Sequence, residues 1–224
     1  MLLTVLGILC LGLLPKAERT ETAAGLPIEG RVIVVDAGHG GFDGGASGGG
    51  VSEKDVNLSV AHKLREYIEQ GGGIVVMTRR EDVSTAEKNT KGISAKKSDL
   101  AARKQLAEES NADAFVSIHM NKFPQTQYKG AQVFYGNEPS EGKLLGETLQ
   151  NTLKETIHDG NTRMAKKTDG SIFILKDTKI PSVIIECGFL SNPDEAKLLS
   201  QEEYQQKMAW GIYLGLVRFF NGEL

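Results

Sequence analysis

Three short runs of apolar, mostly β-branched residues each end at a polar residue, and this pattern constrains the fold more than any other feature of the chain. The runs are 32–35 before Asp36, 114–118 before His119, and 183–185 before Glu186. Short runs without polar alternation are typical of buried strands in a parallel or mixed sheet. Because the carboxyl ends of such strands form the ligand crevice of open α/β sheets, polar side chains that are far apart in sequence could meet there.

The segments between these runs alternate between helical and strand patterns. Further strand patterns occur at 74–77, at 171–175 and at 131–135, which alternates as a more exposed strand. Helical patterns cover 56–68, 99–110, 141–157 and 204–220. A polar segment typical of a solvated loop lies at 84–98. This alternation predicts an α/β fold, a three-layer sandwich whose mixed, mostly parallel sheet has helices on both faces.

Two histidines and a glutamate are candidate ligands of one metal ion. His39 lies in a glycine-rich loop and His119 follows an apolar run. Glu53 begins the helical pattern after the loop, where Ser52 could cap the helix. Two imidazoles, one carboxylate and a water are the usual ligands of a catalytic zinc. Glu186 is then left for proton transfer, because a carboxylate in an apolar stretch needs a compensating cation or donor.

Each of these features also has a plainer interpretation. A single histidine after a strand is more often a hydrogen-bonded structural residue than a ligand. The segment Gly38–Gly41 could bind phosphate through its backbone N–H groups, but neither the Walker pattern nor the dinucleotide fingerprint follows it. Asp36 could orient a ligand imidazole or cap a turn, and Asn121 could bind substrate or close the loop after its strand. Cys187 is better interpreted as a small buried hydrophobe than as a nucleophile.

Charge and the N-terminal pattern limit the partners and the location. The 224-residue chain has a net charge of −3, which gives no electrostatic basis for binding nucleic acid. Residues 2–14 are apolar, too short for a span of ~20 residues but suited to a signal. We therefore expect residues 1–30 to be an export leader or anchor with a linker, and 31–224 to be the catalytic domain. Membrane contact is expected only through an uncleaved leader.

The loop after Asn121 is short. Only residues 122–129 separate Asn121 from the next strand, and these are too few to form a helix that could block the candidate metal site.

Motifs spread along the chain resemble one known family. They are DAGHGGFDGGA from Asp36, EKDVNL from Glu53, TRRED from Thr78, Arg103, SIHMN from Ser117 and PSVIIECGFLSN from Pro181. Together they are similar to the zinc-dependent N-acetylmuramoyl-L-alanine amidases of the bacterial cell wall, the amidase 3 family, over about residues 31–220. One departure is Ala37, which stands where many members have Pro.

The resemblance implies a zinc-hydrolase/phosphorylase-like fold and one Zn²⁺ per chain. Its ligands would be His39, Glu53 and His119, and Glu186 would be the catalytic residue. The implied substrate is peptidoglycan, cut at the amide between N-acetylmuramic acid and the L-alanine of the stem peptide. A silent wall-binding module and a zinc peptidase that cuts other bonds remain alternatives from other classes.

Within the family, the chain looks most similar to the sporulation-associated amidases of endospore formers. That likeness implies removal of stem peptides from the spore cortex, so that muramic-δ-lactam can form. It also implies export to the forespore intermembrane space or cortex, with an exported regulatory protein as a possible partner. A vegetative autolysin or cell-separation amidase is the alternative.

Overall fold

The computed structural model describes residues 26–86, 91–136 and 139–223. The predicted leader therefore lies almost entirely outside the described residues, and the boundary expected at residue 30 stays a prediction. No helix in the described part of the chain combines the length and the apolar character that crossing a bilayer requires.

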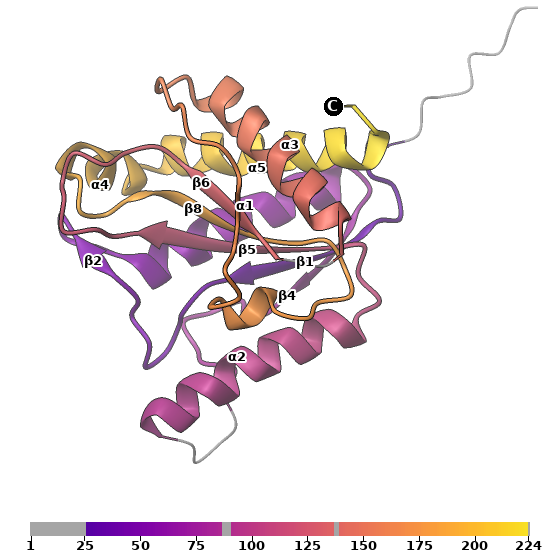
Figure 1. The fold of residues 1–224 in the computed structure, drawn as a ribbon, viewed down its shortest axis with the longest axis horizontal. Coiled ribbons are helices and arrows are strands. Elements are labelled where there is room, and N and C mark those ends of the chain that lie inside the picture. Colours follow the sequence, from indigo (N-terminus) through magenta and orange to yellow (C-terminus); the bar gives the residue numbers. More distant parts are fainter. Residues whose placement is uncertain (1–25, 87–90, 137–138, 224) are drawn as a thin grey trace, which may run out of the picture.

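A six-stranded sheet forms the centre of the molecule, with strand order β4-β1-β5-β8-β6-β7 (Figure 1). The strands are β1 (Val32–Ala37), β4 (Ile74–Met77), β5 (Ala114–Asn121), β6 (Gln132–Tyr135), β7 (Lys166–Lys167) and β8 (Ser182–Phe189). Strands β4, β1, β5 and β8 are parallel neighbours, whereas β6 pairs antiparallel to β8. The mixed, mostly parallel sheet predicted from the three apolar runs is confirmed. A separate hairpin joins β2 (Ser47–Gly48) to β3 (Val51–Ser52).

Helices cover both faces of the sheet, which completes the predicted α/β sandwich. One face carries α1 (Glu53–Gln70), α3 (Glu141–Ile157), α4 (Pro193–Leu199) and α5 (Glu202–Asn221). The opposite face carries α2 (Gly92–Glu109) and the short 3₁₀ helix η1 (Phe173–Leu175). Alternate residues of each strand point to opposite faces, so Val35 packs in the larger core under α1 and Val34 in the smaller core near α2.

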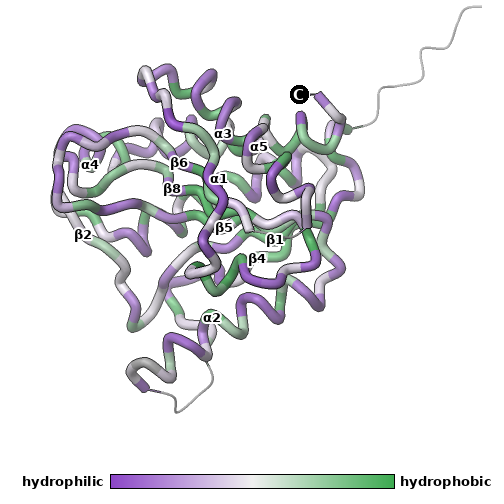
Figure 2. Tube along the Cα trace, in the orientation of Figure 1, coloured by the Kyte–Doolittle hydropathy of each residue, from purple (hydrophilic) through white to green (hydrophobic). Residues whose placement is uncertain are grey.

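The two cores differ in character. Within the described residues, the central strands are the most apolar part, whereas α2 is mostly hydrophilic (Figure 2). The largest fully buried side chain is Arg103 of α2. This helix is therefore anchored to the sheet through a buried cation as well as through apolar residues such as Ala107.

Three local predictions are wrong. The segment 171–175 forms η1 instead of a strand, because Ile174 and Leu175 pack into the smaller core from a single 3₁₀ turn. Strand β6 is mostly buried, because α3 packs on one face and Gln132 is enclosed on the other. Helix α2 begins at Gly92, within the segment interpreted as a loop, since lysine and alanine support a helix without an apolar stripe.

Candidate metal centre

The two predicted histidine ligands meet on one oxygen of the predicted glutamate ligand. Glu53 Oε1 lies 3.1 Å from His39 Nε2 and 3.0 Å from His119 Nδ1. One donor atom from each residue lies within 4.8 Å of the others, a grouping that could hold a metal ion. The structure thus brings together three side chains that come from a loop, a helix start and a strand.

The backbone at the start of α1 sets the position of Glu53. Ser52 occupies the N-cap position, but its side chain makes no capping hydrogen bond, so the capping expectation is wrong. Glu53 instead turns back to the loop, where its Oε2 accepts a hydrogen bond from Ala46 N at 2.6 Å. Its Oε1 accepts one from Met120 N at 3.1 Å. Both oxygens are therefore fixed while the carboxylate is 3% exposed.

Glycine is required at two points where the loop passes the ligand side chains. A Cβ built on Gly38 would lie 2.3 Å from His119 Nε2. Gly45 has φ of +66°, and a Cβ there would lie 2.5 Å from Glu53 Oε2. The glycine-rich composition of the loop thus reflects close approach to the imidazole and the carboxylate, and no phosphate cradle is needed to explain it.

The electrostatics of the cluster suit a bound cation. Burial by itself would raise the pKa of Glu53, but hydrogen bonds and charge from His119 and His39 hold it far below its usual range. Burial acts to lower the pKa of His39, and the neighbouring carboxylates of Glu53 and Asp43 outweigh it and raise that pKa. A divalent ion would replace these protons with a charge that all three side chains can share.

Glu186 lies beside the cluster without belonging to it. It is the register partner of His119 across β5 and β8, so the two side chains share a face of the sheet. Among the described residues, its buried Oε2 has no hydrogen-bond partner. Burial raises the pKa of Glu186 overall, although the charge of His119 acts to lower it. A carboxyl group in this position can exchange a proton with a molecule that enters the site.

The residues present fit a zinc ion. Zinc–ligand bonds of ~2.0–2.1 Å in a tetrahedron place neighbouring ligand atoms about 3.3 Å apart. The two Glu53–histidine separations, 3.0 and 3.1 Å, are close to that spacing. The buried oxygen of Glu186 beside them still needs a polar partner.

Two buried arginines hold the loop that carries His39. Arg79 Nε donates to Ala37 O at 2.8 Å, and its Nη2 donates to Gly38 O at 3.1 Å. Arg103 Nη1 donates to Ala37 O at 2.8 Å, and its Nη2 donates to His39 O at 2.7 Å. Both arginines belong to motifs visible in the sequence, but their role depends on contacts that no spacing rule predicts.

Asp36 binds Arg103, one of these two arginines. Neither of the two roles predicted for Asp36 is correct. Its carboxylate accepts hydrogen bonds from Arg103 Nη1 at 2.6 Å, from Thr78 Oγ1 at 2.6 Å and from Ser117 Oγ. It neither orients an imidazole nor caps a turn. Burial acts to raise its pKa, but the charge of Arg103 and the two hydroxyl groups lower it overall.

The carboxylate that orients an imidazole is Asp43, which sequence reasoning missed. Its Oδ2 lies 3.0 Å from His39 Nδ1, and Lys96 Nζ lies 3.1 Å from the same oxygen. The signal was present, because Asp43 stands four residues after His39 in the same motif. Only the turn of the loop, with His39 itself at φ of +62°, brings the carboxylate back to the ring.

Cys187 conforms to its plainer interpretation. It is fully buried and burial raises the pKa of its thiol, which leaves it protonated and unsuited to nucleophilic attack. The backbone oxygen of Asn121 accepts a hydrogen bond from Leu190 N at 2.8 Å, which joins the end of β5 to the turn after β8, and the role of its side chain stays a prediction.

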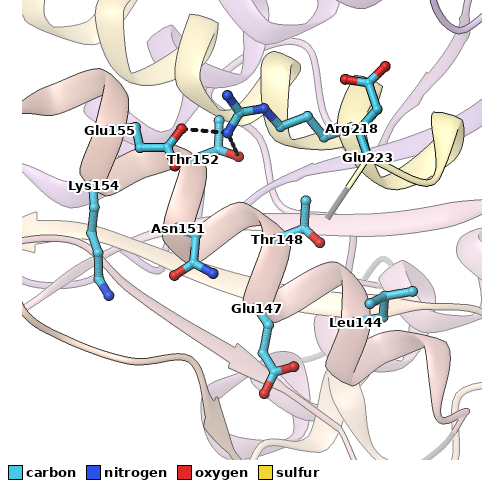
Figure 3. Close-up of a pocket in the computed structure, with 9 residues that line it drawn as sticks. All are labelled: Leu144, Glu147, Thr148, Asn151, Thr152, Lys154, Glu155, Arg218 and Glu223. Carbon is cyan, nitrogen blue, oxygen red and sulfur yellow. Dashed lines mark hydrogen bonds and ion pairs between the residues drawn. The ribbon is translucent and has the colours of Figure 1, made fainter.

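A hollow on the other face of the sheet lacks comparable chemistry. It lies along α3 and α5, where Arg218 Nη1 pairs with Glu155 Oε2 at 2.6 Å and donates to Thr152 Oγ1 at 3.1 Å (Figure 3). Among the described residues, those that line it form no cluster of three ligand groups that could hold a metal ion. The candidate site is therefore the edge of the sheet at His119 and Glu186.

Comparison with known proteins relates the chain to one family. Residues 33–218 match the amidase 3 family model, described as N-acetylmuramoyl-L-alanine amidase. The chain is 42% identical over 197 residues to the germination-specific N-acetylmuramoyl-L-alanine amidase of Bacillus subtilis, covering 88% of this chain and 82% of that protein.

Solved structures show the same fold. The CwlD amidase of Clostridioides difficile, in complex with the GerS lipoprotein, superposes with a TM-score of 0.83 at 45% identity and covers 86% of this chain and 99% of that one. The amidase AmiC2 of Nostoc punctiforme gives a TM-score of 0.73 at 31% identity, covering 85% and 97%. On this evidence of sequence and fold, the chain belongs to the family of N-acetylmuramoyl-L-alanine amidases.

Proposed function

We propose that His39, Glu53 and His119 bind one Zn²⁺ and that Glu186 is the catalytic carboxylate of this amidase. The observation that carries the proposal is the group of two imidazole nitrogens and one carboxylate oxygen beside a buried, unpartnered carboxyl oxygen. Zinc bound there would polarise the substrate carbonyl and lower the pKa of a water toward ~7.

The protein's own side chains supply the proton transfers and the orientation. Glu186 Oε2 accepts a proton from the attacking water and then delivers it to the departing alanine nitrogen. Its Oε2 has no hydrogen-bond partner among the described residues, so it is available to both proton transfers. Asp43 accepts a hydrogen bond from His39 Nδ1–H, which leaves Nε2 free to bind the metal.

Zinc content and peptide release test these assignments separately. His39→Ala and His119→Ala should lose both bound zinc and the release of L-alanine-terminated peptides from purified sacculi. Glu186→Gln should keep zinc and lose peptide release, because a general base need not be a ligand. Loss of zinc in the Glu186 variant would show that the two glutamates have been assigned wrongly.

The nature of the products separates the alternative functions. New N-termini other than L-alanine would identify a peptidase instead of an amidase. Zinc binding without release of any peptide would identify a silent wall-binding module.

We further propose that the substrate is spore-cortex peptidoglycan, cleaved outside the cytoplasmic membrane in the forespore intermembrane space. The 42% identity to a germination-specific amidase supports this setting. An exported regulatory protein is part of the proposal, since the CwlD amidase of C. difficile was solved in complex with a lipoprotein.

Cortex chemistry tests the setting. Cortex from a deletion strain should lack muramic-δ-lactam, and its spores should begin germination without completing it. Normal δ-lactam, together with chained or lysis-resistant growing cells, would instead assign the enzyme to vegetative wall turnover.

A further inference from the structure

The face of the sheet that carries the candidate site continues beyond Glu186. Gln132 of β6 is the register partner of Glu186, and Lys166 of β7 is the register partner of Phe134. Partners in adjacent strands share a face, and residues two apart in a strand do too. His119, Glu186, Gln132 and Lys166 therefore lie on one side of the sheet, and the exposed Lys166 marks its solvent-accessible end.

A hollow of about 520 Å³ opens at this end of the face. Its lining combines aromatic rings with two cations and contains no acidic side chain. The lining residues are Phe123, Pro124, Gln125, Tyr128, Arg163, Lys166 and Phe189. Phe123 and Tyr128 are 47% and 41% exposed, although they pack edge to face with ring centroids 5.8 Å apart. The hollow is large enough for an amino-acid side chain with its adjoining backbone.

The guanidinium of Arg163 is held in place with donors to spare. It stacks 4.7 Å from the ring centroid of Phe189, and its Nε donates to Lys129 O at 3.0 Å. Its Nη1 donates to Gln132 Oε1 at 3.3 Å, and Gln132 is the register partner of Glu186 in the neighbouring strand. Within the described residues, Nη2 makes no hydrogen bond. A guanidinium fixed in this way is pre-organised for a carboxylate.

Two cations close to the metal cluster are already compensated by carboxylates. Lys96 pairs with Asp43 at 3.1 Å. Arg103 pairs with Asp36 and Asp99, each at 2.6 Å. Neither the Lys166 ammonium nor Arg163 has an acidic partner of this kind among the described residues. In a chain of net charge −3, the two cations therefore mark a local preference for an anion.

We propose that Arg163 and Lys166 form a carboxylate-binding subsite for the stem peptide, on the leaving-group side of the scissile amide. The proposal rests on the proposed function, in which the substrate has a glycan on one side of that amide and a peptide on the other. The sugar units are uncharged, whereas the peptide that follows L-alanine carries carboxylates. The cations match the peptide, and the rings of Phe123 and Tyr128 match its apolar side-chain stems.

A pair of substrates that differ in one carboxylate tests the subsite. One carries L-alanyl-D-glutamate on a muramoyl glycan, and the other carries the same dipeptide with its α-carboxylate converted to a carboxamide. The protein should cleave the carboxylate substrate with about ten-fold higher kcat/KM, the value expected for a charge-assisted contact. Lys166→Gln should lose most of this preference through KM, and Lys166→Glu should reverse it.

The neighbouring residue in β7 provides a matched control. Lys167 is exposed like Lys166, but its side chain lies on the other face of the strand. Lys167→Gln should therefore leave the substrate preference unchanged. Arg163→Lys keeps the charge without the planar fork and should give an intermediate preference, with zinc content equal to that of the wild type.

The possible failures are distinguishable. If the wild type cleaves both substrates equally, or if the Lys166 and Lys167 variants behave alike, the subsite proposal is wrong while the amidase function stands. If the zinc-loaded wild type cleaves neither substrate nor sacculi, the proposed function itself fails.

Discussion

Two imidazoles face one carboxylate oxygen because small residues stand where any side chain would collide. Gly38 is the clearest case, since a Cβ there would lie 2.3–2.7 Å from three atoms of the His119 ring. Asp43 then fixes the ring of His39 through its other nitrogen, Nδ1. At the residue scale, the site therefore depends on steric space and on one orienting carboxylate as much as on its ligands.

Gly38→Ala should abolish tight zinc binding without unfolding the protein. The added Cβ would lie 2.3 Å from His119 Nε2, so the ring must move away from Glu53. Zinc content after dialysis and a far-UV circular dichroism spectrum measure the two effects. Gly44→Ala is the control, because nothing lies within 4 Å of a Cβ at that position. Equal zinc content in both variants would contradict the steric argument.

Asp43→Asn should weaken zinc binding by about 10–100-fold while the fold remains intact. The amide cannot match the carboxylate as an acceptor for His39 Nδ1–H, so the imidazole becomes a poorer and less fixed ligand. Competition with a chromogenic chelator measures the affinity. Glu81→Gln removes an exposed acid from the neighbouring loop and should leave the affinity unchanged. An unaltered affinity in Asp43→Asn would mean that the contact does not support the metal.

At the scale of elements, α2 is fixed by a charge network under the site. Arg103 connects Asp99 of its own helix to Asp36 of β1, and all three side chains are buried or nearly so. Asp99 Oδ1 also accepts hydrogen bonds from Ser84 Oγ at 2.8 Å and from Thr85 N at 2.7 Å. Removing one member leaves an uncompensated charge, which in buried pairs costs about 3–5 kcal/mol.

This network predicts a loss of stability in acid. Burial alone would raise the pKa of Asp99, but Arg103, Ser84 and Thr85 hold it below its ordinary value. A depressed pKa contributes stability that is present above the unfolded pKa of about 4 and is lost as the pH falls through the folded value. Asp99→Asn should therefore be less stable than the wild type at pH 7, and the difference in urea midpoint should narrow at pH 3. A constant difference would show that ionisation of Asp99 is irrelevant.

At the scale of the whole molecule, the two faces of the sheet divide stability from chemistry. Under α1, α3 and α5 the buried hydrophobic residues form one continuous cluster. The other face carries the buried ion pairs of Arg103, the unpartnered oxygen of Glu186 and the candidate ligand His119, and Glu53 reaches the site from the first turn of α1. Changes on the two faces should therefore affect different measurements.

Leu149→Ala should destabilise the protein by about 2–5 kcal/mol without changing kcat at a temperature where the variant is folded. Leu149 is fully buried between α3 and α5, far from the site face. Urea unfolding and peptide-release assays measure the two quantities. Leu144→Ala, in the same helix but 37% exposed, should change stability by only about 0.5 kcal/mol. A large fall in kcat for Leu149→Ala would show that the faces are coupled.

The central strands, most helices and the three side chains that meet at the candidate metal centre can be predicted from the amino-acid pattern alone. Apolar runs at 32–35, 114–118 and 183–185 predict buried strands because few other structures accommodate such runs. The residues after them must then lie at one edge of the sheet. Helix 141–157 was predicted with the same bounds that the structure shows, since its apolar spacing is regular.

The partner that each polar group finds could not be predicted from the sequence, because it depends on how distant segments pack. In the folded protein, Asp36 pairs with Arg103, and Asp43 orients the ring of His39. Both contacts depend on how segments that are separate in the sequence come together. Where a strand was expected at 171–175, the structure has η1 at Phe173–Leu175, and α2 begins as early as Gly92. In short or polar segments such as these, packing outweighs weak local preference. The aromatic and cationic hollow at Arg163 likewise joins residues from three separate segments, and no local pattern in the sequence brings them together.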